Sequence, residues 1–81
     1  MSNASIQAPV PGVFYRRPAP DQPPFKEAGD SVAVGEVIGL VEVMKTFYEV
    51  KAEQAGTITE FLVENEGAVT AGQVLASLAS A

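Results

Sequence analysis

The 81-residue chain contains no cysteine and no histidine. Their absence excludes disulfide bonds, zinc sites with thiolate or imidazole ligands, and every mechanism that depends on a cysteine or histidine side chain. Most hydrolytic chemistry is excluded with them. A chain this short is expected to form one small domain, because two lobes with a cleft between them need more residues.

Positive charge is also scarce, with 5 basic residues against 10 acidic ones and a formal net charge of −5. This sign is unsuited to neutralising phosphates, so we expect no nucleic-acid partner. The apolar stretch over residues 37–41 contains a glycine and is far shorter than the roughly 18 residues of a membrane-spanning helix. We therefore expect no membrane partner. No apolar block precedes Arg16, so a secretory signal is not expected either.

Short strands dominate the predicted secondary structure. Apolar residues make up 47% of the chain, and all six prolines lie within the first 24 residues. From Phe25 onward, short runs of Val, Ile, Leu, Phe and Thr alternate with Gly, Asp, Asn and Glu, a pattern typical of strands joined by turns. We predict an all-β domain over residues 6–79 and interpret residues 1–5 as a cloning remnant or disordered segment.

An internal repeat with an offset of 37 residues organises the chain. Four pairs share this offset: Val32 and Val69, Gly35 and Gly72, Val37 and Val74, and Ile38 and Leu75. Residues 12–15 resemble residues 56–59 at an offset of 44, so the first copy carries seven extra residues within the proline-rich segment 16–24. The repeat predicts a flattened β-barrel or sandwich of two pseudo-symmetric four-stranded halves.

Residues 38–51 predict a β-hairpin with Met44-Lys45 as its two-residue turn. This register makes one face apolar and places every charge on the other. The first face has the pairs Val43–Thr46, Val41–Tyr48 and Gly39–Val50; the second has Glu42–Phe47, Leu40–Glu49 and Ile38–Lys51. Two-residue turns favour Asn-Gly or Asp-Gly, which accept positive φ, so Met-Lys is a poor choice. Residues that conflict with the geometry of their turn and bring no local stability indicate that the turn has a functional role.

We interpret Lys45 as a post-translational attachment point at the tip of this hairpin. Exposed lysine amines are protonated at neutral pH and are poor nucleophiles, so a separate enzyme would have to acylate it. A lysine of the Schiff-base kind needs a desolvating pocket, which a hairpin tip cannot provide. The alternative is an ordinary surface lysine on a longer loop.

The sequence Glu42-Val43-Met44-Lys45 resembles the attachment motif of biotinyl domains, usually Glu-Ala-Met-Lys-Met. The resemblance covers nearly all of residues 8–78. Val43 stands where the family usually has Ala, and Thr46 where it usually has Met. Met44 is retained where lipoyl domains have Asp, which favours biotin over lipoate.

The proline-rich insertion narrows the resemblance to the biotin carboxyl carrier proteins of bacterial-type acetyl-CoA carboxylase. That family has a protruding thumb with a Ser-Pro-Ser-Pro-Asp type sequence, matched here by residues 17–21. By resemblance, segment 16–24 is a thumb that lies near the hairpin and touches the prosthetic group. The implied fold is the barrel-sandwich hybrid.

The resemblance implies a non-catalytic, cytoplasmic carrier that moves carboxylate from biotin carboxylase to carboxyltransferase for fatty acid biosynthesis. Biotin protein ligase would attach the biotin, and no metal is implied. The cofactor-binding residues would be Lys45, which carries the biotin, Met44, Val43 and Thr46, with Ala19, Pro20 and Asp21 from the thumb. The alternatives are a lipoyl domain, a carrier for another biotin-dependent carboxylase, or an unmodified binding module with the same fold.

Overall fold

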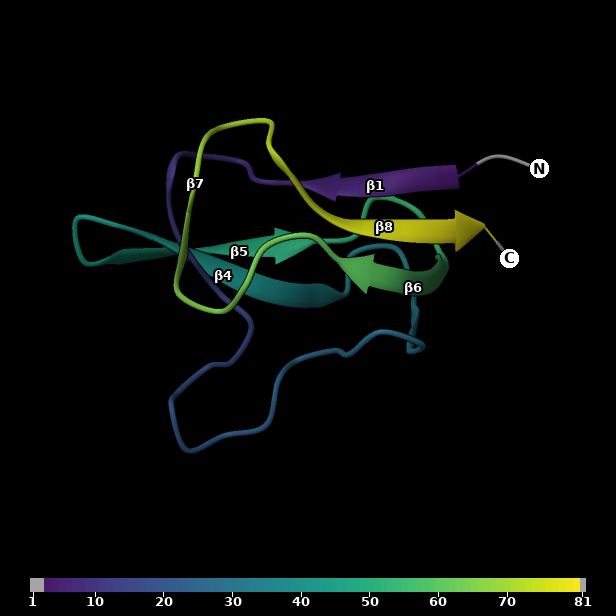
Figure 1. Cartoon of the computed structure of the whole chain (residues 1–81), viewed down its shortest axis with the longest axis horizontal. Coiled ribbons are helices and arrows are strands. Elements are labelled where there is room, and N and C mark those ends of the chain that lie inside the picture. The colour runs from purple at the N-terminus through teal and green to yellow at the C-terminus, as the bar shows by residue number, and fades with distance from the viewer. Residues whose placement is uncertain (1–2, 81) are drawn as a thin grey trace.

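The computed structural model describes residues 3–80, which form eight strands and no helix. The strands are β1 (Asn3–Gln7), β2 (Gly12–Tyr15), β3 (Ser31–Val32), β4 (Val37–Val43), β5 (Thr46–Lys51), β6 (Gly56–Phe61), β7 (Gly67–Val69) and β8 (Val74–Ser80). They make two four-stranded antiparallel sheets, ordered β1-β8-β6-β3 and β5-β4-β2-β7 (Figure 1). The predicted all-β fold of two four-stranded halves is confirmed.

The pseudo-twofold repeat is visible in the hydrogen bonds of its turns. The N–H of Gly35 donates to the carbonyl of Ala52 at 2.7 Å, and that of Gly72 donates to the carbonyl of Ala8 at 2.9 Å. Both glycines have positive φ, 87° and 82°, which residues with a Cβ rarely adopt. The short strands β3 and β7 pair with β6 and β2 respectively, so each copy of the repeat contributes one strand to the other copy's sheet.

Alternating side chains from both sheets fill the core between them. The side chains that are almost completely buried are Phe14, Ile38, Val41, Val50, Ile58, Leu75 and Leu78. Burying one such side chain contributes about 1.5–3 kcal/mol. The Phe14 ring lies against Gly39, where an added Cβ would stand 2.5 Å from Cε1 of the ring. This core holds β4, and therefore the predicted attachment hairpin, against β2.

The N-terminal strand begins earlier than the sequence analysis expected. Asn3 pairs with Ala79, and the pairing of β1 with β8 continues to Gln7 and Val74. Residues 3–5, expected to lie outside the domain, therefore belong to a sheet, because β8 offers them an edge to pair with. Residues 1 and 2 of that expected segment lie outside the described residues.

One pair of the predicted hairpin register is wrong. Ile38 was expected opposite Lys51 on the charged face, but the register shifts between Val37 and Gly39, so that Val37 pairs with Lys51. The shift places Ile38 in the core, where it is completely buried. The other five predicted pairs are confirmed.

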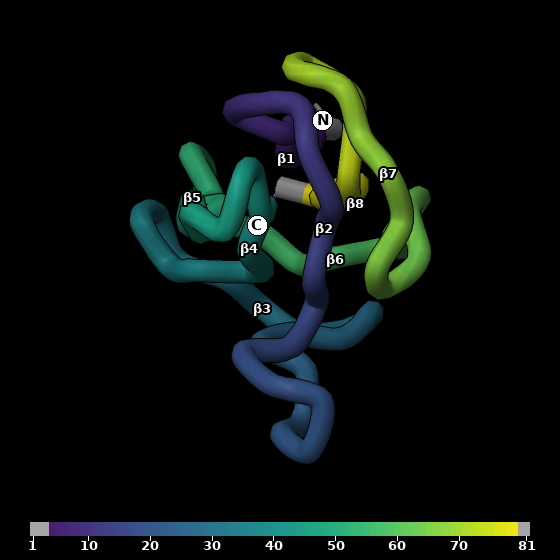
Figure 2. The backbone as a smooth tube through the Cα atoms, turned by 90° about the vertical axis from the view of Figure 1, so that its left-hand side faces the viewer, coloured from purple at the N-terminus to yellow at the C-terminus, as the bar shows by residue number. Residues whose placement is uncertain are grey.

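The proline-rich insertion forms a long loop between β2 and β3 that extends away from the sheets (Figure 2). We call residues 16–24 the thumb. The N–H of Phe25 donates to the carbonyl of Arg16 at 2.9 Å and closes the loop at its base. A further bond from the N–H of Gln22 to the carbonyl of Ala19, 3.1 Å, forms a turn near its tip. The guanidinium of Arg16 lies 4.0 Å from the centre of the Phe61 ring of β6, which fixes the base of the thumb to the sheet β1-β8-β6-β3.

Candidate functional site

The hairpin between β4 and β5 ends in the predicted two-residue turn. Val43 pairs with Thr46, and the two residues between them, Met44 and Lys45, have φ values of 50° and 69°. Positive φ at both central positions is the geometry of a type I′ turn, which suits the twist of the flanking strands. A residue with a Cβ is disfavoured there by about 1–2 kcal/mol. The backbone geometry of this turn therefore suits a two-residue hairpin, whereas Met44 and Lys45 are unfavourable residue types for it.

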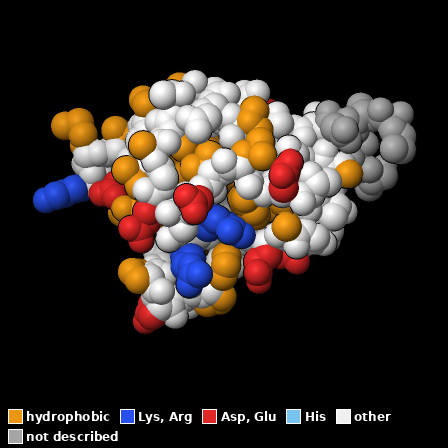
Figure 3. Space-filling model, in the orientation of Figure 1, with side chains coloured by type: hydrophobic (Ala, Val, Ile, Leu, Met, Phe, Trp, Pro, Cys, Tyr) orange, Lys and Arg blue, Asp and Glu red, His pale blue; other side chains and the backbone are white. Residues whose placement is uncertain are grey.

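Both turn side chains point into solvent. Met44 is 93% exposed, and Lys45 is exposed beside it. The hairpin tip forms the left end of the molecule in Figure 3, with basic and hydrophobic side chains projecting from it. An enzyme approaching this end would meet both side chains with little obstruction.

The three lysines of the chain differ in their surroundings. Lys26 forms an ion pair of 2.7 Å with Glu36, and Lys51 forms one of 3.5 Å with Glu49. Within residues 3–80, Lys45 has no ion pair. Its amine can be acylated without breaking an existing ionic contact.

Beneath the turn, Tyr15 of β2 joins the neighbouring strands on the outer face of the sheet. Its hydroxyl donates a hydrogen bond of 3.0 Å to Oε1 of Glu42, and its ring lies 6.2 Å from that of Phe47 at an interplanar angle of 57°. The pKa of Tyr15 is raised, first by this bond to Glu42, then by desolvation and by the negative charges of Glu42 and Glu66. These contacts connect β2, β4 and β5 directly below the attachment turn.

A cavity of about 250 Å³ lies between the thumb and this face of the sheet. We call it the thumb cavity; its lining residues are Tyr15, Arg17, Pro18, Ala19, Pro20, Phe47, Asn65 and Glu66. Phe47 is two residues from Lys45, so their Cα atoms are at most about 7.6 Å apart. A group on Lys45 therefore starts close to the cavity.

The structure brings together only part of the set expected from the sequence. Ala19 and Pro20 line the thumb cavity, whereas Asp21 is exposed and does not. Val43 and Thr46 flank the turn without reaching the cavity lining.

Most of the cavity wall was missed by the sequence analysis, because it comes from three separate segments. One signal was available for Glu66. The offset of 37 residues aligns it with Gly29, so a glycine in the first copy is replaced by an acidic residue in the second.

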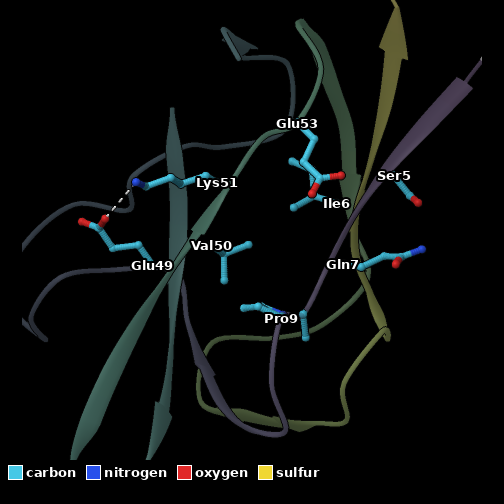
Figure 4. A pocket seen from close by; sticks show the side chains of 9 residues that line it. Ser5, Ile6, Gln7, Pro9, Glu49, Val50, Lys51 and Glu53 are labelled. Atoms are coloured by element: carbon cyan, nitrogen blue, oxygen red, sulfur yellow. Dashed lines mark ion pairs between the residues drawn. The ribbon is translucent and has the colours of Figure 1, made fainter. Parts of the chain in front are cut away.

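A larger groove, of about 450 Å³, lies between the edges of β1 and β5 (Figure 4). Ile6 and Val50 are buried beneath it, and the ion pair between Lys51 and Glu49 lies on one side. The groove is at the end of β5 opposite the attachment turn. Among residues 3–80 no three acidic side chains gather into a possible metal site, and no helix could span a membrane.

Comparison with protein families identifies the type of domain. The model of the biotin/lipoyl family, described as a biotin-requiring enzyme, matches residues 4–78. The chain belongs to this family. The exposed amine of Lys45 on a two-residue turn fits the covalent attachment that a biotin/lipoyl domain provides, and the thumb cavity offers room beside it for one small ring system.

Several curated relatives of this biotin/lipoyl domain are named biotin carboxyl carrier protein of acetyl-CoA carboxylase. The chain is 43% identical to the chloroplastic protein 2 of Arabidopsis thaliana over 60 residues, which are 74% of this chain and 24% of the relative. It is 43% identical to the Streptococcus pyogenes protein over 70 residues, 86% of this chain and 42% of the relative. For the Chlamydia pneumoniae protein the identity is 40% over 74 residues, 91% and 44% of the two chains. The chain thus spans less than half of each relative.

Solved structures share the fold of the biotin/lipoyl domain. Kluyveromyces lactis urea carboxylase matches with a TM-score of 0.78 and 25% identity, over 98% of this chain and 6% of that one. A single-chain, multi-domain long-chain acyl-CoA carboxylase matches with the same TM-score at 20% identity, over 98% and 7% of the two chains, which shows likeness of fold alone.

Proposed function

We propose that this chain is a biotin carboxyl carrier domain that bears biotin on Lys45 and serves an acetyl-CoA carboxylase. The single observation that carries the proposal is the type I′ turn whose two strained positions hold Met44 and an exposed Lys45 that forms no ion pair within residues 3–80. The names of the curated relatives support biotin and acetyl-CoA carboxylase over the alternatives. The retained Met44 favours biotin over lipoate.

The hairpin makes Lys45 accessible to a second protein. A protonated amine in solvent is a poor nucleophile, so a biotin protein ligase must supply biotin as an activated acyl group and accept the proton. An amide bond forms between Nζ of Lys45 and the biotin carboxyl carbon, while the bond from that carbon to the activating group breaks and the activating group leaves. Met44 and the flanking Val43 and Thr46 form the surface beside Lys45 that the ligase would contact.

The domain itself contributes placement and reach. Biotin, when attached, supplies the chemistry of carrying a carboxyl group, as is general for prosthetic groups. Tethering raises the local concentration at each partner site, first biotin carboxylase and then the carboxyltransferase that acts on acetyl-CoA. Ala19 and Pro20 of the thumb, together with Phe47, would contact the biotin ring while it is at neither partner active site.

The proposed domain runs from β1 to β8, with the thumb at 16–24 and the attachment hairpin at 38–51. It has no catalytic residues of its own. Its place would be the cytoplasm, with biotin protein ligase, biotin carboxylase and carboxyltransferase as partners.

Co-expression with an active biotin protein ligase, followed by intact-mass measurement and peptide mapping, tests this proposal. We expect one biotin per chain, on Lys45, and none in Lys45→Arg. Lys51→Arg is the matched control on the same hairpin and should be labelled like the parent. Biotin on Lys26 or Lys51, or no biotin while a known carrier is fully labelled, would contradict the assignment. Lipoate on Lys45 would make the chain a lipoyl domain.

Carboxyl transfer is tested separately with the biotinylated protein. Purified biotin carboxylase, supplied with ATP to activate labelled bicarbonate, should load the protein, and carboxyltransferase should move the label to acetyl-CoA. Loading without transfer to acetyl-CoA would indicate that the domain serves another biotin-dependent carboxylase.

A further inference from the structure

Glu66 occupies a backbone position that the fold fills with glycine in its other copy. Its φ is 68°, and the corresponding Gly29 has a φ of 97°. The N–H of Glu66 donates to the carbonyl of Phe14 at 2.6 Å, and the N–H of Gly29 donates to the carbonyl of Ile58 at 2.7 Å. The two turns are therefore equivalent, and only the second holds a residue that disfavours this conformation. Retained strain of this kind indicates that the side chain has a role.

Glu66 and Arg17 both line the thumb cavity, and both are exposed to solvent. Within residues 3–80, neither the carboxylate of Glu66 nor the guanidinium of Arg17 has an ion-pair partner. The cavity thus presents one unpaired acceptor group and one unpaired donor group. The aromatic residues Tyr15 and Phe47, whose ring centres are 6.2 Å apart, line the same cavity.

The position of Asn65 keeps this turn against the base of the thumb. Its Oδ1 accepts a hydrogen bond of 2.8 Å from the N–H of Arg16, the residue before Arg17. The negative charge of Glu66 also contributes to the raised pKa of Tyr15, after the bond to Glu42 and desolvation. Glu66 is therefore close to the aromatic wall as well as to the thumb.

A cyclic urea matches this set of groups. Its carbonyl oxygen accepts hydrogen bonds, its two N–H groups donate them, and its ring faces can pack on aromatic side chains. Bonds from a neutral N–H to a carboxylate, or from a guanidinium to a carbonyl oxygen, are charge-assisted and stronger than neutral ones. The cavity volume of about 250 Å³ lies below the roughly 300–1,000 Å³ of pockets for larger ligands, which suits one small ring system.

We propose that Glu66 and Arg17 are positioning residues that hold the ureido ring of biotin in the thumb cavity. The carboxylate of Glu66 accepts from the ring N–H groups, and Arg17 donates to the ring carbonyl. The adjacent rings of Tyr15 and Phe47 offer an apolar surface on which one face of the ring can pack. This inference rests on the proposed function, because the ring is delivered to the cavity by the arm on Lys45.

Amide NMR shifts of the unmodified and the biotinylated protein test the proposal without any measurement of activity. In the parent, biotinylation of Lys45 should shift the amides of Ala19 and Phe47, which lie on opposite walls of the cavity. In Glu66→Gln and in Arg17→Gln these two shifts should fall at least twofold. In Glu66→Gly they should vanish, although the unmodified variant should resist urea better than the parent.

Glu64→Gln is the matched control, because Glu64 lies two residues away and does not line the cavity. It should keep the parent's shifts. Intact mass must show one biotin on each variant. Parent-sized shifts in both Glu66→Gln and Arg17→Gln, with biotin present, would overturn this inference and leave the carrier function standing. Absence of biotin from Lys45 in the parent would overturn both.

Discussion

The hydroxyl of Tyr15 donates a 3.0 Å hydrogen bond to Oε1 of Glu42, three positions before Lys45. Glu42 is also the cross-strand partner of Phe47, whose ring lies beside that of Tyr15. One residue pair thus links the base of the thumb, the attachment strand and the aromatic wall of the cavity. Disturbing it should affect stability and the thumb cavity together.

Tyr15→Phe should lower the thermal midpoint and change the alkaline limb of the stability profile. Because the folded pKa of Tyr15 is raised above 10.0, the contribution of its protonated form is complete below pH 10.0 and is lost as the pH rises through the folded value. Urea unfolding between neutral pH and pH above 10.0 should therefore show a steeper alkaline loss in the parent than in the variant. Equal slopes would mean that the bond to Glu42 contributes nothing to folding.

Replacing Met44-Lys45 by Asn-Gly should stabilise the domain while removing its attachment amine. Both positions have positive φ, which Asn and Gly accept more readily, so the free energy of unfolding should rise by about 1–3 kcal/mol. Urea unfolding of the unmodified proteins measures the gain, and streptavidin blotting should show no label. Lys45→Arg keeps the Cβ at the strained position and should unfold like the parent. An earlier unfolding of the Asn-Gly variant would contradict the strain assigned to this turn.

Deleting residues 17–23 should leave the fold intact. The N–H of Phe25 and the carbonyl of Arg16 already meet at the base of the thumb at 2.9 Å, and the second copy of the repeat makes the same connection without an insertion. Circular dichroism should be unchanged and Lys45 should still be biotinylated, whereas the biotin-dependent shift of the Phe47 amide should disappear. A variant that cannot fold would show that the thumb prolines are required by the core.

Glu36→Gln should selectively remove acid-sensitive stability. The ion pair with Lys26, and then the bond accepted from the N–H of Ala33, hold the pKa of Glu36 below 4.5. A lowered pKa contributes stability that is present above pH 4.5 and is lost as the pH falls through the folded value. The parent should therefore lose more stability than Glu36→Gln on acidification, as measured by urea unfolding.

The chain contains its own control for the Glu36 experiment. In the second copy of the repeat, Oε1 of Gln73 accepts from the N–H of Thr70 at 3.0 Å, just as Oε1 of Glu36 accepts from that of Ala33 at 2.9 Å. An uncharged amide can thus make the same turn bond. Gln73→Glu, which adds a carboxylate without a lysine partner, should therefore add less acid-sensitive stability than Glu36 contributes in the parent.

The sequence was sufficient to predict the hairpin because its side chains alternate with a period of two, and only one register separates apolar from charged residues. The prediction was wrong at Ile38, since a register shift cannot be seen in an alternating pattern. Residues 3–5 were also misjudged, because the short side chains of Asn3, Ala4 and Ser5 carry no strand signal and their pairing depends on the edge of β8. Both errors concern tertiary pairing and not local preference.

The attachment turn could be predicted from sequence, whereas the thumb cavity could not. Met44 and Lys45 are adjacent, so a local conflict between residue type and turn geometry marks them. The cavity joins Arg17, Phe47 and Glu66, which are distant in sequence and share no local pattern. The sequence signal for the cavity was that Glu66 stands at the repeat position that Gly29 holds in the first copy. That signal can be interpreted only once the residues facing Glu66 are known.

The internal symmetry also determines where a neighbouring polypeptide could be joined. The pair Glu42–Phe47 precedes the attachment turn, and its counterpart Ala79–Asn3 is the last pair before the two chain ends. The start of β1 and the end of β8 thus take the place of a second hairpin, at the other end of the domain from the β4–β5 turn (Figure 1). A polypeptide joined to either end of this domain would leave from the side opposite the β4–β5 turn. The turn with Lys45 could therefore enter a deep active site while that polypeptide stays outside.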